Sequence, residues 1–369
     1  MQNFTIPNTI NKDNNNFDFL RLIAAFLVFF GHSVLITQTG ILTLTQGLAI
    51  GAFGVNIFFI ISGFLITKSW IDSNSGIIFL KKRILRIYPA LIFAILFVIF
   101  IIGPFTTFFT FNTYFHTAAT FEYLNNIFLI KLINLSTNTL PGVFVLNKFP
   151  LVVNASLWTI PIEMGCYFLV ILFGLIKIFK KRIFFLLAFA LLLLYSTALT
   201  LNKDFQSYFQ TYFQFPYLDI IRLITYFFSG IVLYLYKEYL SIPKNYFYLL
   251  LSLLVVSVGF GYFELLSYFL LPILVIFITF LKIDFPKKIT QYGDFSYGFY
   301  LFAFPIQQTV AYLFNGNASF LQQIVFSFFP TLFLAIFSWY VIEKPFLSLK
   351  NFQIFKSVSG YLYKKLKML

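Results

Sequence analysis

Apolar runs of about 20 residues recur along almost the whole chain, and they decide its fold class. A helix of that length crosses the roughly 30 Å of hydrocarbon in a bilayer. Only 10% of the residues are charged, whereas about a quarter are charged in soluble domains. The sequence therefore predicts an all-α integral membrane protein with about ten transmembrane helices. The expected spans cover residues 17–36, 51–69, 87–104, 156–176, 183–201, 216–236, 246–263, 265–281, 295–314 and 321–342.

Basic residues are distributed unevenly between the loops that ten spans create. Only Lys131, Lys148 and Lys203 fall in one set of loops, and Arg21 and Arg222 lie inside spans. The rest of the 26 Lys and Arg residues lie in the loops that share a side with both termini. The positive-inside rule therefore predicts that both termini are cytoplasmic. We expect a multi-pass protein of the cell (inner) membrane. Basic loops beside anionic lipid also explain the net charge of +14, so no nucleic-acid partner is expected.

One membrane domain, residues 17–343, is expected to account for nearly the whole chain. Residues 1–16 form a polar cytoplasmic segment without the features of a signal peptide, so the first span is expected to remain. Residues 344–369 are expected to form a short basic cytoplasmic tail, helical on the membrane surface. The outer loop 105–155 is the one loop long enough to hold structure, and an interfacial helix is predicted within residues 121–135.

Arg21 and His32 are ionisable residues inside the first span. A charged side chain at mid-bilayer costs on the order of 3 kcal/mol, so such residues are candidates for function. Eleven residues advance a helix by about 1100°, which places the two side chains on one face and about 16 Å apart in depth. Asp18 can pair with Arg21 at i, i+3, and that pair alone can be an interfacial anchor. His32 can be a hydrogen-bonded core residue or a general base.

Glu163 is a second buried candidate, in the fourth span. Pro161 favours a helix start or a kink just before it, and a helix N-terminus stabilises a negative charge. Counted inward from Ser156, Glu163 lies about 10 Å deep, close to the depth estimated for His32, so the two can share a cavity. The alternative is a structural partner for Arg222, although the i, i+3 spacing of Asp219 and Arg222 favours a structural pair between those two.

A basic cluster precedes the third span. Arg83 and Arg86 lie one helical turn apart, beside Lys81 and Lys82, and this spacing suits the oxygens of a phosphate group. The same residues can serve only as a positive-inside anchor. The sequence has no Gly-rich phosphate loop, zinc-ligand spacing or nucleophile elbow, so no metal site is expected.

Taken together, the motifs resemble those of the membrane-bound acyltransferase-3 family, which includes bacterial O-antigen and exopolysaccharide O-acetyltransferases. The resemblance covers almost the whole chain, and it rests on the order and spacing of several short motifs. One position departs from it, because many members have a histidine two residues before Pro305, where this chain has Ala303. That difference indicates a subgroup that never uses this histidine, or altered handling of the acceptor. The motifs are Phe17-Asp18-Phe-Leu-Arg21 with His32, Phe58 to Thr67 around Ser62-Gly63, Arg83-x-x-Arg86-x-Tyr88-Pro89, Leu157-Trp158 with Glu163, Ser296-Tyr297-x-x-Tyr300 to Pro305, and Glu343-Lys344-Pro345.

The resemblance implies transfer of an acyl group, commonly acetyl, from cytoplasmic acetyl-CoA to a hydroxyl of a glycan or lipid-linked oligosaccharide at the membrane. Acetyl-CoA is then a donor substrate, and the acceptor is expected on the outer side. Our hypothesis assigns coenzyme A phosphates to the basic cluster and deprotonation of the hydroxyl, or transient carriage of the acyl group, to His32. The thioester would enter near Arg21, and Glu163 would orient or charge the imidazole. The candidate residues are His32, Arg21, Glu163 and Asp18 for catalysis, and Arg83, Arg86, Lys81 and Lys82 for the coenzyme.

Two other classes of function compete with this hypothesis. In a transporter or flippase of a lipid-linked glycan, the same buried charges would form a proton or substrate path. Such transporters often contain paired repeats with broken helices, and the sequence shows no such symmetry. In a noncatalytic assembly protein the buried charges would be purely structural. The expected depths leave one difficulty for acyl transfer, since the coenzyme residues lie at the inner face and His32 lies nearer the outer one.

Overall fold

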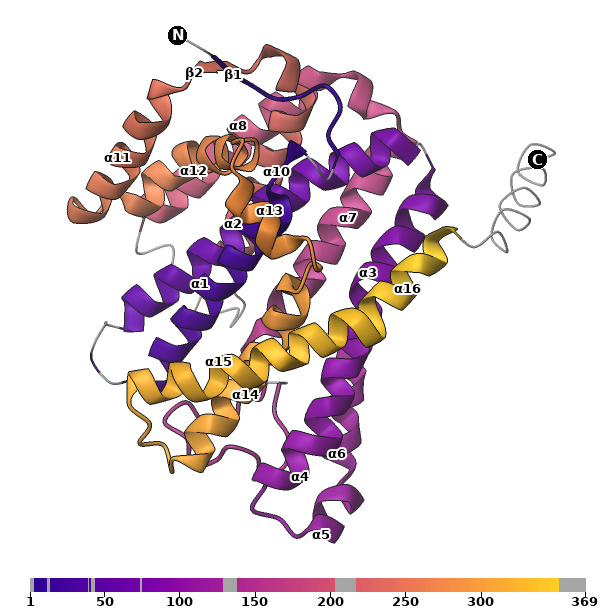
Figure 1. The fold of residues 1–369 in the computed structure, drawn as a ribbon, viewed down its shortest axis with the longest axis vertical. Coiled ribbons are helices and arrows are strands. Elements are labelled where there is room, and N and C mark those ends of the chain that lie inside the picture. The colour runs from indigo at the N-terminus through magenta and orange to yellow at the C-terminus, as the bar shows by residue number, and fades with distance from the viewer. Residues whose placement is uncertain are drawn as a thin grey trace, which may run out of the picture.

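A computed structural model describes residues 3–11, 14–38, 40, 44–73, 75–128, 138–202 and 217–351. Within these residues the protein is almost entirely helical, and its one sheet has two short strands (Figure 1). Ten helices correspond to the ten predicted spans. They are α1 (Phe17–Thr37), α2 (Leu44–Ser73), α3 (Gly76–Phe97), α7 (Thr159–Leu175), α8 (Arg182–Leu201), α10 (Tyr217–Leu235), α11 (Asn245–Gly259), α12 (Phe263–Thr279), α14 (Ser296–Leu313) and α15 (Phe320–Phe337).

By length and composition, seven helices of the described chain can cross a membrane. Helices α11 and α12 are shorter, with 15 and 17 residues. Helix α14 has 18 residues, but its glutamines and tyrosines lower its hydropathy. Most of its side chains, including Gln307 and Gln308, are buried against other helices, so α14 does not need an apolar surface for lipid. The protein is thus an all-helical membrane protein, and the count of ten crossings stays a prediction.

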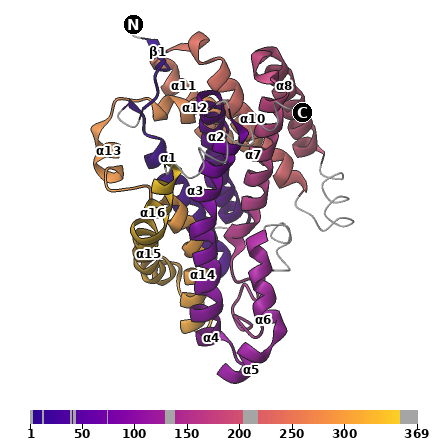
Figure 2. The same cartoon turned by 90° about the vertical axis from the view of Figure 1, so that its right-hand side faces the viewer.

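Helix α3 begins earlier than the sequence analysis predicted. The continuous helical segment covers residues 76–106, because α3 passes through a π-helical stretch, Val98–Ile102, into α4 (Gly103–Thr106). Figure 2 shows this segment running along much of the molecule. The span predicted for residues 87–104 lies within this segment, and the helix extends before it to include the basic cluster. Those charged side chains are compatible with the helix because several of them line a polar cavity, described below.

Contacts between loops agree with the predicted grouping of the loops into two sides. Strand β1 (Asn3–Thr5) pairs antiparallel with β2 (Ser241–Pro243), which joins two loops expected to share the side of the N-terminus. At the C-terminal end of α1, the Lys148 ammonium donates to the Thr37 carbonyl oxygen at 3.1 Å, and this contact joins two segments expected on the opposite side. The two strands and α4 lie at opposite ends of the molecule (Figure 1). Which side faces the cytoplasm stays a prediction.

The predicted outer loop contains short helices rather than one long one. Helices α5 (Phe111–His116) and α6 (Ala118–Glu122) are followed by a 3-10 helix, Tyr123–Phe128. The rest of the interfacial helix predicted within residues 121–135 lies outside the described residues. Near the C-terminus, α15 continues through the π-helical segment Ser338–Glu343 into α16 (Lys344–Ser348). The predicted tail is described only as far as residue 351, and a short helix, α13 (Asp284–Thr290), precedes α14.

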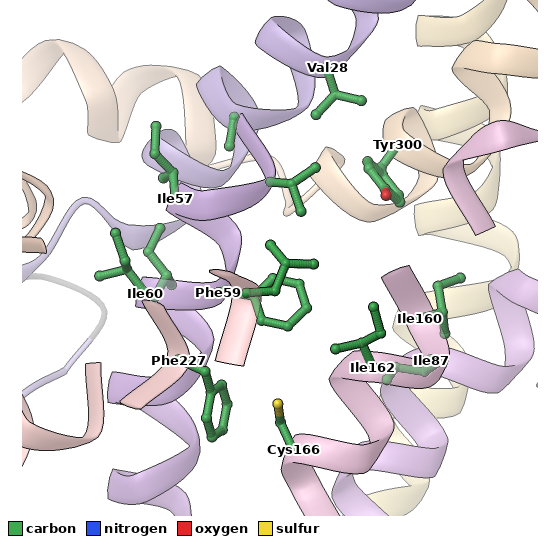
Figure 3. Packing of buried hydrophobic residues seen from close by; sticks show 14 of the residues in the cluster. Val28, Ile57, Phe59, Ile60, Ile87, Ile160, Ile162, Cys166, Phe227 and Tyr300 are labelled. Atoms are coloured by element: carbon green, nitrogen blue, oxygen red, sulfur yellow. The ribbon is translucent and has the colours of Figure 1, made fainter. Parts of the chain in front are cut away.

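Helices α2 and α10 form the centre of the bundle through a backbone-to-backbone contact. A Cβ atom on Gly63 of α2 would lie 2.0 Å from the carbonyl oxygen of Phe227, and one on Gly230 of α10 would lie 2.2 Å from that of Ile60. Only glycine allows helices to approach this closely, as at other small-residue contacts in membranes. Figure 3 shows side chains of the apolar cluster to which residues of both helices belong. They include Ile57, Phe59 and Ile60 of α2, Phe227 of α10, and Ile160, Ile162 and Cys166 of α7.

Candidate active site

Three cavities with shared walls lie along α1, and they define the candidate site. The first, the basic basin, has a volume of about 570 Å³. It shares Arg21, Leu65, Arg83 and Arg86 with a connecting cavity of about 90 Å³. The connecting cavity in turn shares Val55 and Tyr300 with a third cavity of about 420 Å³, the His32 cavity. Arg21 and His32 therefore face one series of cavities, as their spacing on α1 predicted.

The basic basin is lined by six basic and three acidic side chains among the described residues. Arg83, Arg86 and Lys82 of the predicted coenzyme cluster line it. Lys81 does not line any of the three cavities, and its ammonium donates to the carbonyl oxygen of Lys350 at 3.5 Å. The basin thus offers an excess of positive charge to an anionic group. Its charged residues are Arg21, Lys68, Lys82, Arg83, Arg86 and Lys350, with Asp18, Asp72 and Asp294.

A network of ion pairs links α1, α3 and the turn before α14 at the basin. Asp294 accepts from Arg86 at 2.5 Å and from Arg21 at 3.4 Å, and its side chain is 8% exposed. Arg21 also contacts Asp18 at 3.1 Å, which confirms the predicted i, i+3 pair. The second nitrogen of the Arg86 fork lies 3.5 Å from Glu343. Sequence reasoning missed Asp294, because the two arginines that pair with it are more than 200 residues away along the chain.

The charge balance around Asp294 keeps that residue ionised. Burial alone raises the pKa of its carboxyl group, but the positive charges of Arg86 and Arg21 and hydrogen bonds from Ser296 outweigh burial. The pKa of Asp294 is therefore held below its ordinary value. As a carboxylate, Asp294 fixes two guanidinium groups at the junction between the basin and the connecting cavity.

Arg83 and Arg86 differ in their surroundings although α3 places them one turn apart. The Arg86 guanidinium forms ion pairs with Asp294 and Glu343. It also lies 5.9 Å from the ring centre of Tyr297 and 6.0 Å from that of Trp339. Arg83 makes no ion pair among the described residues. Its Nη2 donates to Ser69 at 3.3 Å, and its buried Nε has no hydrogen-bond partner. Arg83 is thus the arginine of the pair with unused hydrogen-bond donors.

Glu163 lines the connecting cavity, whereas the sequence analysis expected it to share a cavity with His32. Helix α7 begins at Thr159, as Pro161 indicated, so the carboxylate lies about one turn into the helix. It accepts hydrogen bonds from the Ser62 hydroxyl at 3.1 Å and from the Tyr167 hydroxyl. His32 lines the neighbouring cavity instead. Similar estimated depths did not imply contact, because depth does not determine which helices lie next to each other.

Tyr300 stands where the connecting cavity meets the His32 cavity. Its hydroxyl donates to the Ser156 carbonyl oxygen at 2.8 Å and forms a 2.7 Å hydrogen bond with the Thr159 hydroxyl. These bonds tie α14 to the start of α7. Figure 3 shows Tyr300 beside the apolar cluster that includes Ile160. The sequence placed Tyr300 in a motif without assigning it a role.

The position of His32 depends on packing against an aromatic ring and on hydrogen bonds made by the residues next to it on α1. Its ring packs edge-on against Phe304 of α14, with 4.9 Å between ring centres. On the next turn, Gln307 donates to the carbonyl oxygen of Phe29 at 2.8 Å and to the Ser33 hydroxyl at 2.7 Å, which fixes α14 to α1. The buried Nδ1 of His32 has no hydrogen-bond partner. The imidazole is therefore positioned by packing rather than by a hydrogen bond at Nδ1.

Ala303, where the common histidine is missing, lies in an apolar cluster outside the three cavities. It is 1% exposed and packs with Ala25 and Phe29 of α1, Phe299 of α14 and Ala335 of α15. The cluster fills the interface between these three helices. In this chain the position therefore serves packing, and it contributes no side chain to the candidate site.

Comparison with known proteins agrees with the motifs. Residues 14–342 match the model of a family described as an acyltransferase domain. An O-acetyl transferase of Shigella phage Sf6 is 28% identical over 345 residues, which cover 91% of this chain and 96% of the phage protein. Nodulation protein 10 of Rhizobium leguminosarum bv. viciae is 50% identical over 80 residues, 21% of this chain and 22% of that protein. No solved structure matches the chain significantly. The family match spans nearly the whole helical bundle that encloses the three cavities, and the chain belongs to the acyltransferase-3 family.

Proposed function

We propose that this membrane acyltransferase is an O-acetyltransferase of the cell (inner) membrane. It moves an acyl group from cytoplasmic acyl-CoA to a hydroxyl of a cell-surface glycan or of its lipid-linked precursor. The observation that carries the proposal is the series of cavities that leads from a basic basin to His32. The phage relative, named an O-acetyl transferase, covers almost the same length of chain and supports the type of reaction.

The basic basin suits the phosphates of a coenzyme A donor. Arginine forks bind phosphate oxygens through paired, charge-assisted hydrogen bonds. Arg83 has unused donors and lines the basin, and Lys82 lies beside it, so these two residues make the best phosphate ligands. Arg86 and Arg21 are engaged with carboxylates, and we assign them to shaping the entrance of the connecting cavity. Lys81 lies outside the basin, and we give it no role in donor binding.

The series of cavities also answers the problem of depth. Arg21 and His32 are separated by about 16 Å along α1, and the connecting cavity bridges this interval beside the helix. The long, flexible arm of an acyl-CoA can extend from the basin through the connecting cavity and bring its thioester past Tyr300. The connecting cavity is the smallest of the three, so the arm must displace side chains as it passes.

At His32 the reaction takes the form of base-assisted acyl transfer. The oxygen of a glycan hydroxyl attacks the thioester carbonyl carbon, and an imidazole nitrogen of His32 accepts the hydroxyl proton. The new carbon–oxygen bond forms as the carbon–sulfur bond breaks, and the coenzyme leaves as a thiolate that takes up the proton. In the alternative order, His32 first carries the acyl group and then passes it to the hydroxyl. Glu163, bound to Tyr167 and Ser62, shapes the path rather than charging the imidazole.

A transporter or flippase of a lipid-linked glycan remains the alternative, because polar cavities in series also suit a substrate path. Transfer of labelled acetyl from acetyl-CoA to membrane glycan separates the two functions. We expect label in the wild type, no label with His32→Ala, and a raised requirement for acetyl-CoA with Arg83→Ala or Arg86→Ala. Glu238→Gln, a change in the half-exposed pair with Arg182, is the control for expression and folding. No transfer from any short acyl-CoA, together with movement of the glycan across the membrane, would establish the transporter.

A further inference from the structure

Three of the side chains that line the His32 cavity carry a buried polar atom without a hydrogen-bond partner in the described part of the chain. The atoms are Nδ1 of His32, Oδ1 of Asn56 and Nε of Arg222. Asn56 is 6% exposed, and its amide oxygen is buried. A buried polar group without a partner is costly, so folded proteins contain few of them. Three such groups in the wall of one cavity are what a polar ligand would satisfy after a small rotation of the side chains.

The side chains of His32 and Asn56 converge across this cavity. Helices α1 and α2 meet near Gly31 and Gly51, where a Cβ on Gly51 would lie 4.0 Å from the Gly31 Cα. The two helices run in opposite directions, as the contact of Gly54 with Ala24 and Val28 shows. Each side chain leans toward the N-terminus of its own helix. His32 therefore leans toward the basic basin and Asn56 leans away from it, so the two groups point into the space between them.

Charge distinguishes this cavity from the basic basin. Arg222 pairs with Asp219 of the same helix at 2.7 Å, and Glu264 of α12 lines the same wall. Two carboxylates and one guanidinium give no excess of positive charge for a phosphate. Asp219, Arg222 and Glu264 also line an adjoining cavity of about 210 Å³. The polar wall therefore continues beyond His32, and it favours hydroxyl groups over anions.

Aromatic rings form an apolar part of the wall of the same cavity. Trp158, Phe53 and Phe263 line it, and the rings of Phe53 and Phe263 lie 5.6 Å apart. An apolar wall with a few convergent polar groups is the usual composition of a small-molecule site. A sugar ring presents both kinds of surface, since its C–H groups pack on aromatic rings and its hydroxyls donate and accept hydrogen bonds.

From these observations we infer that the His32 cavity is the acceptor subsite and that it binds one neutral pyranose unit. Asn56, Arg222 and Glu264 recognise its hydroxyls, the aromatic wall holds its apolar face, and the hydroxyl to be acylated lies at His32. The adjoining cavity accepts a neighbouring sugar of the same chain. This inference rests on the proposed function, of which it names the acceptor site.

The test measures binding apart from catalysis. The purified full-length protein is heated with and without total glycolipid extracted from membranes of the native host cells. A ligand that binds only the folded state raises the unfolding temperature. We expect the extract to stabilise the wild type and His32→Ala, and to stabilise Asn56→Leu and Glu264→Gln much less. Glu238→Gln is the matched control for loss of a carboxylate, and it should respond as the wild type does.

The acyl-transfer assay then gives a second measure for the same variants. We expect Asn56→Leu and Glu264→Gln to raise the apparent KM for the glycolipid about tenfold and to leave the KM for acetyl-CoA within twofold. Stabilisation that is absent in the wild type, or equal in all variants, overturns the acceptor subsite. Stabilisation that depends on Asn56 and Glu264 without any acetyl transfer by the wild type would instead retain the subsite and refute the proposed function.

Discussion

Replacing Asp294 with asparagine tests whether the ion-pair network holds the basic basin together. Asp294 contacts both Arg86 and Arg21, at 2.5 and 3.4 Å. The substitution preserves the size of the side chain and its hydrogen-bonding oxygen, and it removes the negative charge. Both arginines keep a second partner, since Arg21 still meets Asp18 and Arg86 still meets Glu343.

The expected loss of stability lies between two limits. Breaking a fully buried pair costs about 3–5 kcal/mol, and breaking an exposed one costs about 0–1 kcal/mol. Asp294 is 8% exposed, but the side chains of Arg86 and Arg21 are 22% and 24% exposed, and each keeps a carboxylate. We therefore expect a loss of roughly 2 kcal/mol, which in a protein of this size lowers the unfolding temperature by about 3 °C.

Thermal unfolding of the protein in detergent at one heating rate measures this effect. The control is Asp72→Asn, which removes a carboxylate that is 51% exposed and paired with Lys68, and it should change the unfolding temperature by less than about 1 °C. An unfolding temperature for Asp294→Asn equal to that of Asp72→Asn would refute the reasoning. We also expect a raised KM for acetyl-CoA in Asp294→Asn, because Arg21 and Arg86 lose their common anchor at the cavity entrance.

Three further predictions address the donor site, the missing histidine and the response to pH. Arg83→Lys should raise the KM for acetyl-CoA about tenfold with little change in kcat, because lysine keeps the positive charge but lacks the planar guanidinium group. Steady-state kinetics measure both constants. Ala303→His should lower the free energy of unfolding by about 2 kcal/mol or more, because the imidazole would enter an apolar cluster where Ala303 is 1% exposed. It should not raise the rate of acyl transfer. The unfolding temperature and the transfer of labelled acetyl measure these two effects. The pKa of Asp294 is lower in the folded protein than its ordinary value of 3.8. The ionised carboxylate therefore stabilises the folded protein fully at pH values above 3.8. This stabilisation is lost as the pH falls through the pKa of Asp294 in the folded protein. The difference in unfolding temperature between wild type and Asp294→Asn should therefore shrink below about pH 4, and a difference that grows there would contradict the ion-pair account.

Helical periodicity was sufficient to predict which residues share a face. The spacing of Arg21 and His32 placed both on one side of α1, and the structure places both along one series of cavities. The spacing of Arg83 and Arg86 likewise put both at the basin. These relations lie within single helices, where the sequence separation determines the geometry. Hydropathy located only the apolar part of α3, because the turns before residue 87 carry several charged side chains.

Contacts between helices were harder to predict from the sequence. Glu163 was expected beside His32 because both have similar depths, but α7 turns Glu163 toward Ser62 and Tyr167. Asp294 and Asn56 received no role, because the ion pairs of Asp294 are with arginines far away in the sequence and Asn56 is an uncharged residue in an apolar run. Their position depends on how the helices pack, which spacing along the chain does not determine.

The close contact of α2 and α10 at Gly63 and Gly230 limits how a donor can move through the protein. Helices that touch through their backbones cannot slide or separate without losing that fit, so the two behave as one rigid body. This body carries Asn56 and Ser62 on α2 and Arg222 on α10. Besides Val55 of α2, the side chain that joins the connecting cavity and the His32 cavity is Tyr300 of α14, which is held by two hydrogen bonds. For the proposed reaction we therefore expect the path to open by rotation of the Tyr300 side chain rather than by movement of α2 against α10.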